Sequence, residues 1–153
     1  MAYERYPIEC PSFTEENEKK YADILNGTSY TECFISPTYY YFIHFGGRGL
    51  STMSSLGIME TDGAVLIHGE LVTEPKNEEE VVEGIRSIKT RYANRLEESP
   101  CAVTLKHRHK VEGREVSHIH FICSTESLLH RSENMERILR GIRKIADKYA
   151  IRE

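Results

Sequence analysis

The chain lacks several features that would define its class at once. It has no tryptophan, and no apolar run approaches the roughly 20 residues that span a bilayer, so we expect no membrane-spanning segment. The N-terminal residues do not show the basic start and the following apolar stretch of a signal peptide. We therefore expect a cytoplasmic (intracellular) protein. The formal net charge of −4 gives no overall attraction to nucleic acid, although basic residues cluster locally.

Cysteine is also scarce and scattered. The four cysteines, Cys10, Cys33, Cys101 and Cys123, form no C-x-x-C pair, which argues against a zinc ribbon or a redox motif. In a protein expected inside a cell, we interpret all four as reduced thiols that are mostly buried.

The N-terminal half predicts a helix followed by strands. At 153 residues the chain is long enough to bury a core, and we expect a single domain over 1–153. A capping pattern before a polar stretch predicts a helix over roughly 13–25, which makes 1–28 a helical N-terminal appendage. Between 28 and 72 the residues are aromatic and β-branched, and Asp62-Gly63 between two apolar runs predicts a hairpin.

The C-terminal half predicts two amphipathic helices around a second hairpin. Apolar residues recur at helical spacing over 78–97 and again over 132–150. The stretch between these helices is typical of two strands that meet near Gly113. Together the elements predict an α+β fold, with an antiparallel sheet of four to five strands and two main helices packed on it, in a ferredoxin-like or RRM-like layout.

His118 and His120 are the strongest candidates for a functional site. They are two residues apart on a predicted strand, so both project from one face while Ile119 and Phe121 point toward a core. Two neutral imidazoles at this spacing can bind one divalent ion and leave positions open for water or substrate oxygens. The alternative is a pair of exposed polar residues. The sequence does not fix a third ligand, and the candidates are His44, Glu60, Glu70 and Glu112.

The register of the hairpin near these histidines is open between two versions. In the first, a two-residue Gly113-Arg114 turn places His109 opposite His118 and His107 opposite His120. Four imidazoles then share one face of the sheet, at cross-strand Cβ distances of about 5 Å.

In the second version a three-residue turn reverses the parity of the hairpin. The residues that then join His118 and His120 on one face are basic, namely Lys106, Arg108 and Lys110. This version predicts a positively charged, metal-capable surface at which the three basic residues bind nucleic acid.

The segment His118-Ile119-His120-Phe121-Ile122-Cys123 resembles the H-U-H-U-U-U motif of the HUH endonuclease superfamily, in which U is a bulky apolar residue. This superfamily includes rolling-circle replication initiators and relaxases. The resemblance implies that His118 and His120 hold Mg²⁺ or Mn²⁺ on a central strand of a ferredoxin-like sheet. It covers residues from about 100 to 153.

Replication initiators also carry a Y-x-x-K motif on a following helix, and this chain has Tyr149-Ala150-Ile151-Arg152 in that place. The resemblance implies that Tyr149 attacks single-stranded DNA, which is nicked and rejoined through a phosphotyrosine intermediate. Arg152 stands where the family has lysine and would contact the phosphate. Tyr149 would have to reach the metal within one chain or across a homodimer.

A second resemblance is to the large subunit of molybdopterin synthase. It is carried by His130-Arg131-Ser132 before the last helix and by Lys148 near its end. It implies a homodimer that works with a small sulfur-carrier partner, with Arg131 and Lys148 binding anions. The Pro-Ile-Trp-Lys ending of that family is absent here.

A third interpretation is a non-catalytic α+β module that binds nucleic acid or protein through its sheet. Tyr39-Tyr40-Tyr41-Phe42 supplies strand aromatics on which bases could stack, although tyrosines in strands usually serve packing. Gly46-Gly47-Arg48-Gly49 could present backbone N–H groups to a phosphate.

Overall fold

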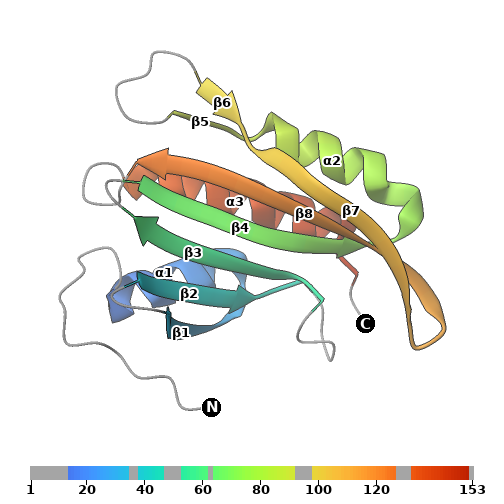
Figure 1. Cartoon of the computed structure of the whole chain (residues 1–153), viewed down its shortest axis with the longest axis horizontal. Coiled ribbons are helices and arrows are strands. Elements are labelled where there is room, and N and C mark those ends of the chain that lie inside the picture. Colours follow the sequence, from blue (N-terminus) through green and yellow to red (C-terminus); the bar gives the residue numbers. More distant parts are fainter. Residues whose placement is uncertain are drawn as a thin grey trace.

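The computed structural model describes residues 14–34, 38–46, 53–61, 64–91, 98–126 and 132–151. A six-stranded antiparallel sheet runs through it in the order β1-β2-β3-β4-β8-β7 (Figure 1). Its strands are β1 (Thr28–Phe34), β2 (Thr38–His44), β3 (Ser55–Thr61), β4 (Ala64–Thr73), β7 (Ala102–Val111) and β8 (Arg114–Glu126). A separate short pair consists of β5 (Lys89–Arg91) and β6 (Glu98–Pro100).

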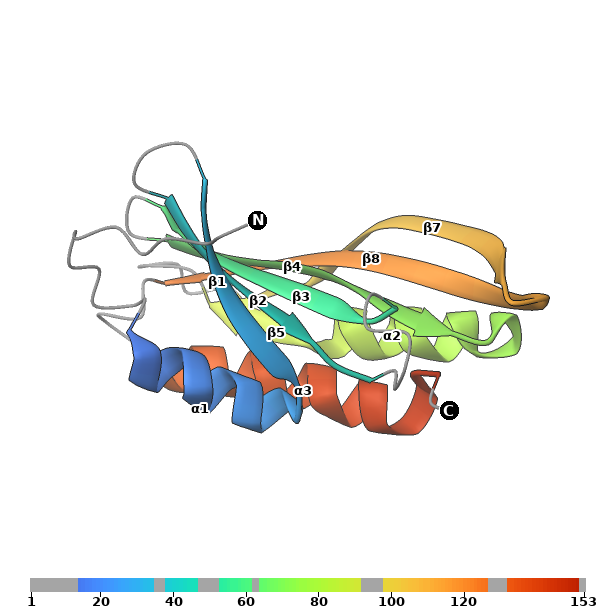
Figure 2. The same cartoon turned by 90° about the horizontal axis from the view of Figure 1, so that it is seen from below.

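Three helices lie on one side of this sheet, as Figure 2 shows. They are α1 (Glu15–Leu25), α2 (Glu78–Ser87), which a 3₁₀ turn at Pro75–Asn77 precedes, and α3 (Ser132–Tyr149). The α+β class is confirmed, but the main sheet has six strands rather than four or five, and three helices pack on it rather than two. Because β1 to β4 are successive antiparallel neighbours, four strands precede α2, unlike the βαββαβ order of ferredoxin-like folds.

The main core lies between the sheet and the helices. β8 sends Ile119 and Phe121 into it, and both are almost completely buried, as the alternation of the strand predicts. α3 supplies an apolar stripe of residues that are fully buried, Met135, Ile138, Leu139 and Ile142. β3 and β4 pair on either side of the predicted hairpin, with Thr61 opposite Ala64, whereas Asp62 and Gly63 themselves lie outside the described residues.

α1 belongs to this core, although we expected it to be an appendage. It begins after Thr14, whose hydroxyl accepts a hydrogen bond from the backbone N–H of Asn17, as helix N-caps do. Its buried residues Tyr21 and Leu25 join the same apolar cluster as the stripe of α3. The Tyr21 ring meets that of Tyr41 on β2 edge to face, at 6.2 Å between centroids.

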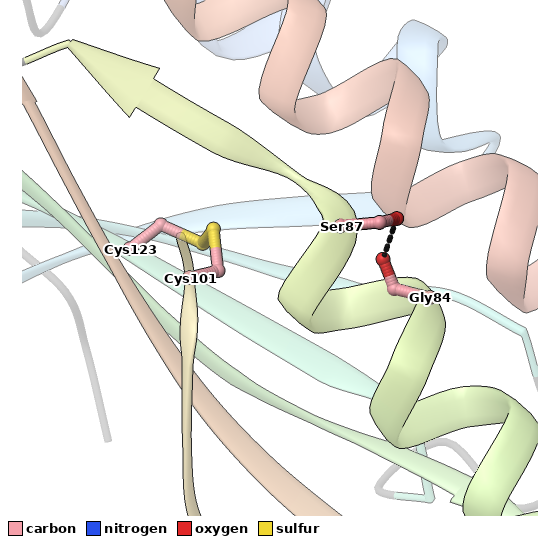
Figure 3. Close-up of a disulfide and its surroundings, with 4 residues drawn as sticks. All are labelled: Gly84, Ser87, Cys101 and Cys123. Atoms are coloured by element: carbon pink, nitrogen blue, oxygen red, sulfur yellow. Dashed lines mark hydrogen bonds between the residues drawn. A yellow bond between two sulfur atoms is a disulfide. The ribbon is translucent and has the colours of Figure 1, made fainter. Parts of the chain in front are cut away.

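α2 is shorter than the predicted helix over 78–97, because the chain becomes extended at Ile88. The backbone there has ψ near 107°, and its carbonyl accepts a hydrogen bond from the N–H of Cys101. The last turn closes with a hydrogen bond from Ser87 Oγ to the carbonyl of Gly84 (Figure 3). Tyr92 and Leu96, which we placed on the same helix, lie outside the described residues.

Cys101 and Cys123 form a disulfide, so the prediction of reduced thiols is wrong for this pair (Figure 3). The bond joins the residue before β7 to β8 in the core, where both sulfurs are buried. Non-local strand pairing brings them together, because Ala102 lies opposite Ile122. The side chains of Cys10 and Cys33 lie outside the described part of the chain. Within that part, no helix is long and apolar enough to cross a membrane.

Candidate metal centre

The hairpin of β7 and β8 turns at Glu112 and Gly113. Both residues have positive φ, 52° and 80°, which corresponds to the type I′ geometry that matches the twist of two-residue hairpins. We expected glycine in the first turn position, but Gly113 occupies the second. Both predicted registers are therefore wrong, and His107 lies opposite His118.

The observed register differs by two residues from the Gly113-Arg114 version. Because side chains alternate with a period of two, each residue of β7 still lies on the face that this version predicted. The helices of the described residues all lie on one face of the sheet (Figure 2), and four imidazoles project from the other face, those of His107, His109, His118 and His120. The rings of His107 and His118 stack at 4.8 Å between centroids, with 10° between their planes. The rings of His109 and His118 are 4.2 Å apart.

Three of these imidazoles have nitrogens close enough to share one ion. One nitrogen each of His107, His118 and His120 lies within 4.8 Å of the other two. Nε2 of His107 and Nε2 of His120 are 3.0 Å apart. In a tetrahedral site with metal–nitrogen distances of about 2.0 Å, neighbouring ligand atoms are roughly 3.3 Å apart. The nitrogens are thus close enough to share one ion, and the stacked rings of His107 and His118 would have to turn for their lone pairs to converge on it.

Glu70 on β4 places a carboxylate against this cluster. It lies opposite His120 in the sheet, and its Oε2 is 3.0 Å from His118 Nδ1 and 3.6 Å from His120 Nε2. Among the four candidates for a third ligand, Glu70 is the one with described contacts to both predicted histidines. The third imidazole comes from His107. From the sequence, His107 was expected beside these histidines only in the Gly113-Arg114 version of the hairpin.

The other three candidates do not join the cluster within the described residues. His44 lies in the same row of the sheet as Glu70 but on β2, two strands away, which is about 10 Å. Glu112 is exposed in the hairpin turn. The side chain of Glu60 lies outside the described residues.

His118 is the most enclosed histidine of the cluster, with only 8% of its surface exposed. Its Nδ1 faces the Glu70 carboxylate, and its Nε2 is buried without a hydrogen-bond partner. If the Nδ1–H donates this hydrogen bond to the carboxylate, Nε2 carries the lone pair, which is the arrangement of carboxylate–histidine–metal triads. A buried nitrogen with no donor nearby is unsatisfied, and a metal ion would satisfy it.

The surroundings of His120 favour its neutral form. Burial lowers the pKa of His120 below its usual value, while the nearby Glu70 carboxylate acts in the opposite direction. Burial also lowers the pKa of His68, two residues before Glu70 on β4. Neutral imidazole is the form that binds metal ions.

A hollow of about 390 Å³ opens beside the cluster on the same face. His120 of the cluster and the neighbouring Glu70 form part of the wall of this hollow. The remaining lining residues are Phe42, Ser55, Gly57, His68, Gly69, Thr104, Phe121 and Ile122. An ion held by the imidazoles would therefore border a space large enough for a small molecule.

The predicted basic residues face the other way. In the observed register Lys106, Arg108 and Lys110 alternate with the histidines of β7 and so lie on the opposite face. Arg108 Nε donates to Glu78 Oε1 of α2 at 2.7 Å. The structure thus separates these three residues from His118, and their binding to nucleic acid stays a prediction.

The structure does not bring Tyr149 to the histidines within one chain. Tyr149 ends α3 on the helix-covered side, where its partly buried ring packs against the main core. Its carbonyl accepts a hydrogen bond from Thr73 Oγ1. Lys148 Nζ lies 5.2 Å from the centre of the Tyr149 ring. Arg152 lies outside the described residues.

No family model, curated protein or solved structure matches this chain. The resemblances to HUH endonucleases and to molybdopterin synthase therefore stay predictions, as do single-stranded DNA and a homodimer. Arg131, from the synthase resemblance, lies outside the described residues, as do the side chains of Tyr39 and Tyr40. Tyr41 is fully buried in the main core and offers no stacking surface, whereas Phe42 lines the hollow.

The wall that β4 contributes to the hollow was not predicted. His68 and Glu70 interrupt the apolar run "AVLIHGELV", and of these two residues only Glu70 was a candidate ligand. The available signal was a pair of polar residues two positions apart on an otherwise buried strand. Such residues must share one face and so indicate a polar site there. Their position beside β8 depends on pairing between segments about 50 residues apart, which the sequence does not show.

Proposed function

We propose that this protein binds one divalent transition-metal ion through His107, His118 and His120, with Glu70 orienting His118. The observation that carries this proposal is the enclosed, unpartnered Nε2 of His118 beside two further imidazoles. Three imidazoles leave at least one coordination position for another ligand, as in catalytic rather than structural metal sites. The hollow beside His120 supports a role in which a small molecule binds the ion at this open coordination position.

The donor set favours Zn²⁺ and similar ions. Imidazole nitrogen suits Zn²⁺, Ni²⁺, Cu²⁺ and Fe²⁺, whereas Mg²⁺ prefers oxygen ligands. Of the two ions implied by the HUH resemblance, Mn²⁺ is thus the better match, but we expect it to bind more weakly than Zn²⁺. A bound ion would supply Lewis-acid chemistry, polarising a water molecule or a carbonyl oxygen at the open position.

Calorimetric titration of Zn²⁺ into chelator-treated protein tests the site. We expect one ion per chain with an affinity of about 1 μM or tighter, which corresponds to roughly −8 kcal/mol. The double variant His118→Ala/His120→Ala should lose at least about 100-fold in affinity, and His107→Ala should lose more than about 10-fold. Glu70→Gln should weaken binding by about 10-fold, because it removes the charge that holds His118.

His109→Ala is the matched control. Its ring lies on the same face, 4.2 Å from that of His118, but it is not one of the three clustered ligands. We expect its affinity for Zn²⁺ to stay within about threefold of the unaltered protein, since no ligand is lost. Equal binding by the double variant would show that these imidazoles do not hold the ion, and an equal loss in His109→Ala would show that the ligand set is assigned wrongly.

A further inference from the structure

β7 contains one residue more than its pairing with β8 requires. Val103 lies opposite Phe121, which faces the core, and Leu105 lies opposite His120, which faces away from the helices. Residues two apart on a regular strand share one face, so this change of face marks a β-bulge at Thr104. Thr104 itself lies opposite no residue of β8 in this register.

The bulge is not needed to place the residues on either side of it. Val103 packs against the main core, and His107 belongs to the histidine cluster. Without Thr104, Val103 and Leu105 would be adjacent and would still face opposite sides, in an unbroken ladder. Bulges recur beside active sites, where they re-aim a side chain. The extra residue therefore indicates a role for Thr104 itself.

Thr104 lies at the edge of the hollow that borders the proposed metal centre. It lines the hollow together with His120 and Glu70. It is exposed, and it directly precedes Leu105, the residue opposite His120. Its hydroxyl group can donate one hydrogen bond to a molecule that binds the ion from this hollow.

The part of the hollow on β3 is closed by a histidine ring. A Cβ atom at Gly57 would lie 2.8 Å from His68 Nε2, so this ring already covers the glycine. A ligand of the ion is therefore expected on the side of β8 and β7, beside Thr104 and Ile122. Ile122 supplies an apolar surface there. We expect a short molecule rather than an aromatic one.

The charge of the lining limits the ligand further. A divalent ion beside the Glu70 carboxylate leaves a single positive charge, which suits a monoanion. Among the residues that line the hollow, none is lysine or arginine, and the basic residues of β7 face the opposite side of the sheet. A phosphate group would lack the arginine or lysine that usually binds it. A carboxylate has the required charge and a second oxygen that accepts a hydrogen bond.

We infer that the hollow binds a short aliphatic monocarboxylate. One carboxylate oxygen would occupy the open coordination position of the ion, and the other would accept a hydrogen bond from the Thr104 hydroxyl. The alkyl tail would pack against Ile122. This inference rests on the proposed metal centre and makes Thr104 a ligand-binding residue.

The test uses the Co²⁺-loaded protein, whose visible absorption reports a ligand that enters the coordination sphere. Acetate, propionate and inorganic phosphate are titrated separately. We expect propionate to bind about threefold more tightly than acetate, because its additional methylene group is removed from water at Ile122. Phosphate should bind more weakly than either carboxylate.

Three variants of Thr104 test the hydrogen bond. Thr104→Val removes the hydroxyl and should weaken acetate binding by about 10-fold, since hydrogen bonds to charged groups are among the stronger ones. Thr104→Ser keeps the hydroxyl and should stay within about threefold of the unaltered protein. Deletion of Thr104 removes the bulge, and it should weaken acetate binding as Thr104→Val does while keeping the Co²⁺ affinity within about threefold.

Leu105→Ala is the matched control for these variants. Leu105 is 55% exposed next to Thr104 and does not line the hollow, so acetate binding should be unchanged.

The outcomes separate the two proposals. If Co²⁺ does not bind to the unaltered protein, the metal centre and the ligand inference both fail. If Co²⁺ binds but acetate binds equally to the unaltered protein and to Thr104→Val, the metal centre stands and the ligand inference is overturned. The ligand inference is also overturned if phosphate binds most tightly or if propionate has no advantage over acetate. Loss of Co²⁺ binding on deletion of Thr104 would overturn it too, because the bulge would then serve to position the histidines.

Discussion

Around His118 and His120 the two faces of the central sheet differ in chemistry, although the same strands supply both. On β8, Ile119 and Phe121 point toward the helices and are almost completely buried in an apolar core. His118 and His120 alternate with them and meet Glu70 on the face without helices. The strand period of two residues thus lets one segment provide stability and a candidate site at the same time.

β7 divides its residues in the same way, but with polar side chains on both faces. Its histidines join the cluster, whereas Arg108 bridges to Glu78 at the start of α2 and approaches Glu115 of β8. The basic residues therefore have a structural partner on the helix-covered side. We infer that substitutions on the covered face change mainly the free energy of unfolding, and that substitutions of the clustered histidines on the open face change mainly metal binding.

The largest effect on stability is expected from Ile119→Ala. Ile119 is 0% exposed, and truncating a buried isoleucine to alanine costs about 3 to 4 kcal/mol in lost burial and cavity formation. Urea denaturation should show this loss, while the still-folded variant keeps its Zn²⁺ affinity within about threefold. His120→Ala is the matched variant on the other face. We expect it to lower stability by less than about 1 kcal/mol and to weaken Zn²⁺ binding by more than about 10-fold. If the two variants behave alike, the division between the faces is wrong.

Removing the disulfide should have the next largest effect. Cys101 and Cys123 are 22 residues apart, and closing a loop of that length stabilises a protein by about 3 kcal/mol in the chain-entropy model. The Cys101→Ala/Cys123→Ala variant should unfold at correspondingly lower urea concentration and keep its metal site. Reducing agent should destabilise the unaltered protein by a similar amount and leave the double variant unchanged. Equal stability of the two proteins under oxidising conditions would contradict this prediction.

Periodic local patterns were the part of the fold that the sequence predicted well. The helix predicted over 132–150 matches α3, and the alternation around Ile119 identified which side of β8 is buried. α2 was predicted too long because Ile88 has the spacing of a helical residue. In the structure the backbone at Ile88 is extended, and its carbonyl accepts a hydrogen bond from the N–H of Cys101. Such tertiary pairing overrides local helix propensity and leaves no trace in the local pattern.

The candidate site could be predicted only in part. His118 and His120 were identified from their spacing, but Glu112 in a left-handed conformation is uncommon, so the turn was misplaced by one residue. The parity of the hairpin was nevertheless right in one version, which put His107 and His109 on the correct face. Glu70 was one candidate among four, because only the pairing of β4 with β8 distinguishes it.

A bound metal ion should increase the free energy of unfolding only when the clustered histidines of the open face are present. An ion that binds only the folded state adds about 2.7 kcal/mol when its free concentration is 100 times the dissociation constant. We therefore expect Zn²⁺ to raise the urea midpoint of the unaltered protein and of His109→Ala. The His118→Ala/His120→Ala variant should show no rise. A rise in that variant would place the ion elsewhere on the chain.

The smallest effect concerns Glu78, the residue that links α2 to the covered face of β7 and β8. Its Oε1 accepts hydrogen bonds from Arg108 Nε and from Ser117 Oγ, and these two contacts lower the pKa of its carboxyl to about 2. Because the pKa in the folded state is below that of the unfolded chain, the carboxylate stabilises the fold above about pH 4.5. This stabilisation is lost as the pH falls from there toward 2. Glu78→Gln should therefore lower the free energy of unfolding by about 1 kcal/mol at pH 7, a value that allows for partial exposure to solvent.

The pH dependence distinguishes this contact from a general effect of charge at the start of α2. The difference between Glu78→Gln and the unaltered protein should shrink between pH 4.5 and pH 2 in urea denaturation, since protonation removes the same charge. Glu79→Gln is the control, because Glu79 is exposed in the same first turn. It should change stability by only a few tenths of a kcal/mol, through the helix dipole. Neither variant should alter the affinity for Zn²⁺, because both residues lie on the helix-covered side. A loss of affinity in Glu78→Gln would mean that the contact between Glu78 and Ser117 also positions the neighbouring His118, and that the two faces of β8 are not independent.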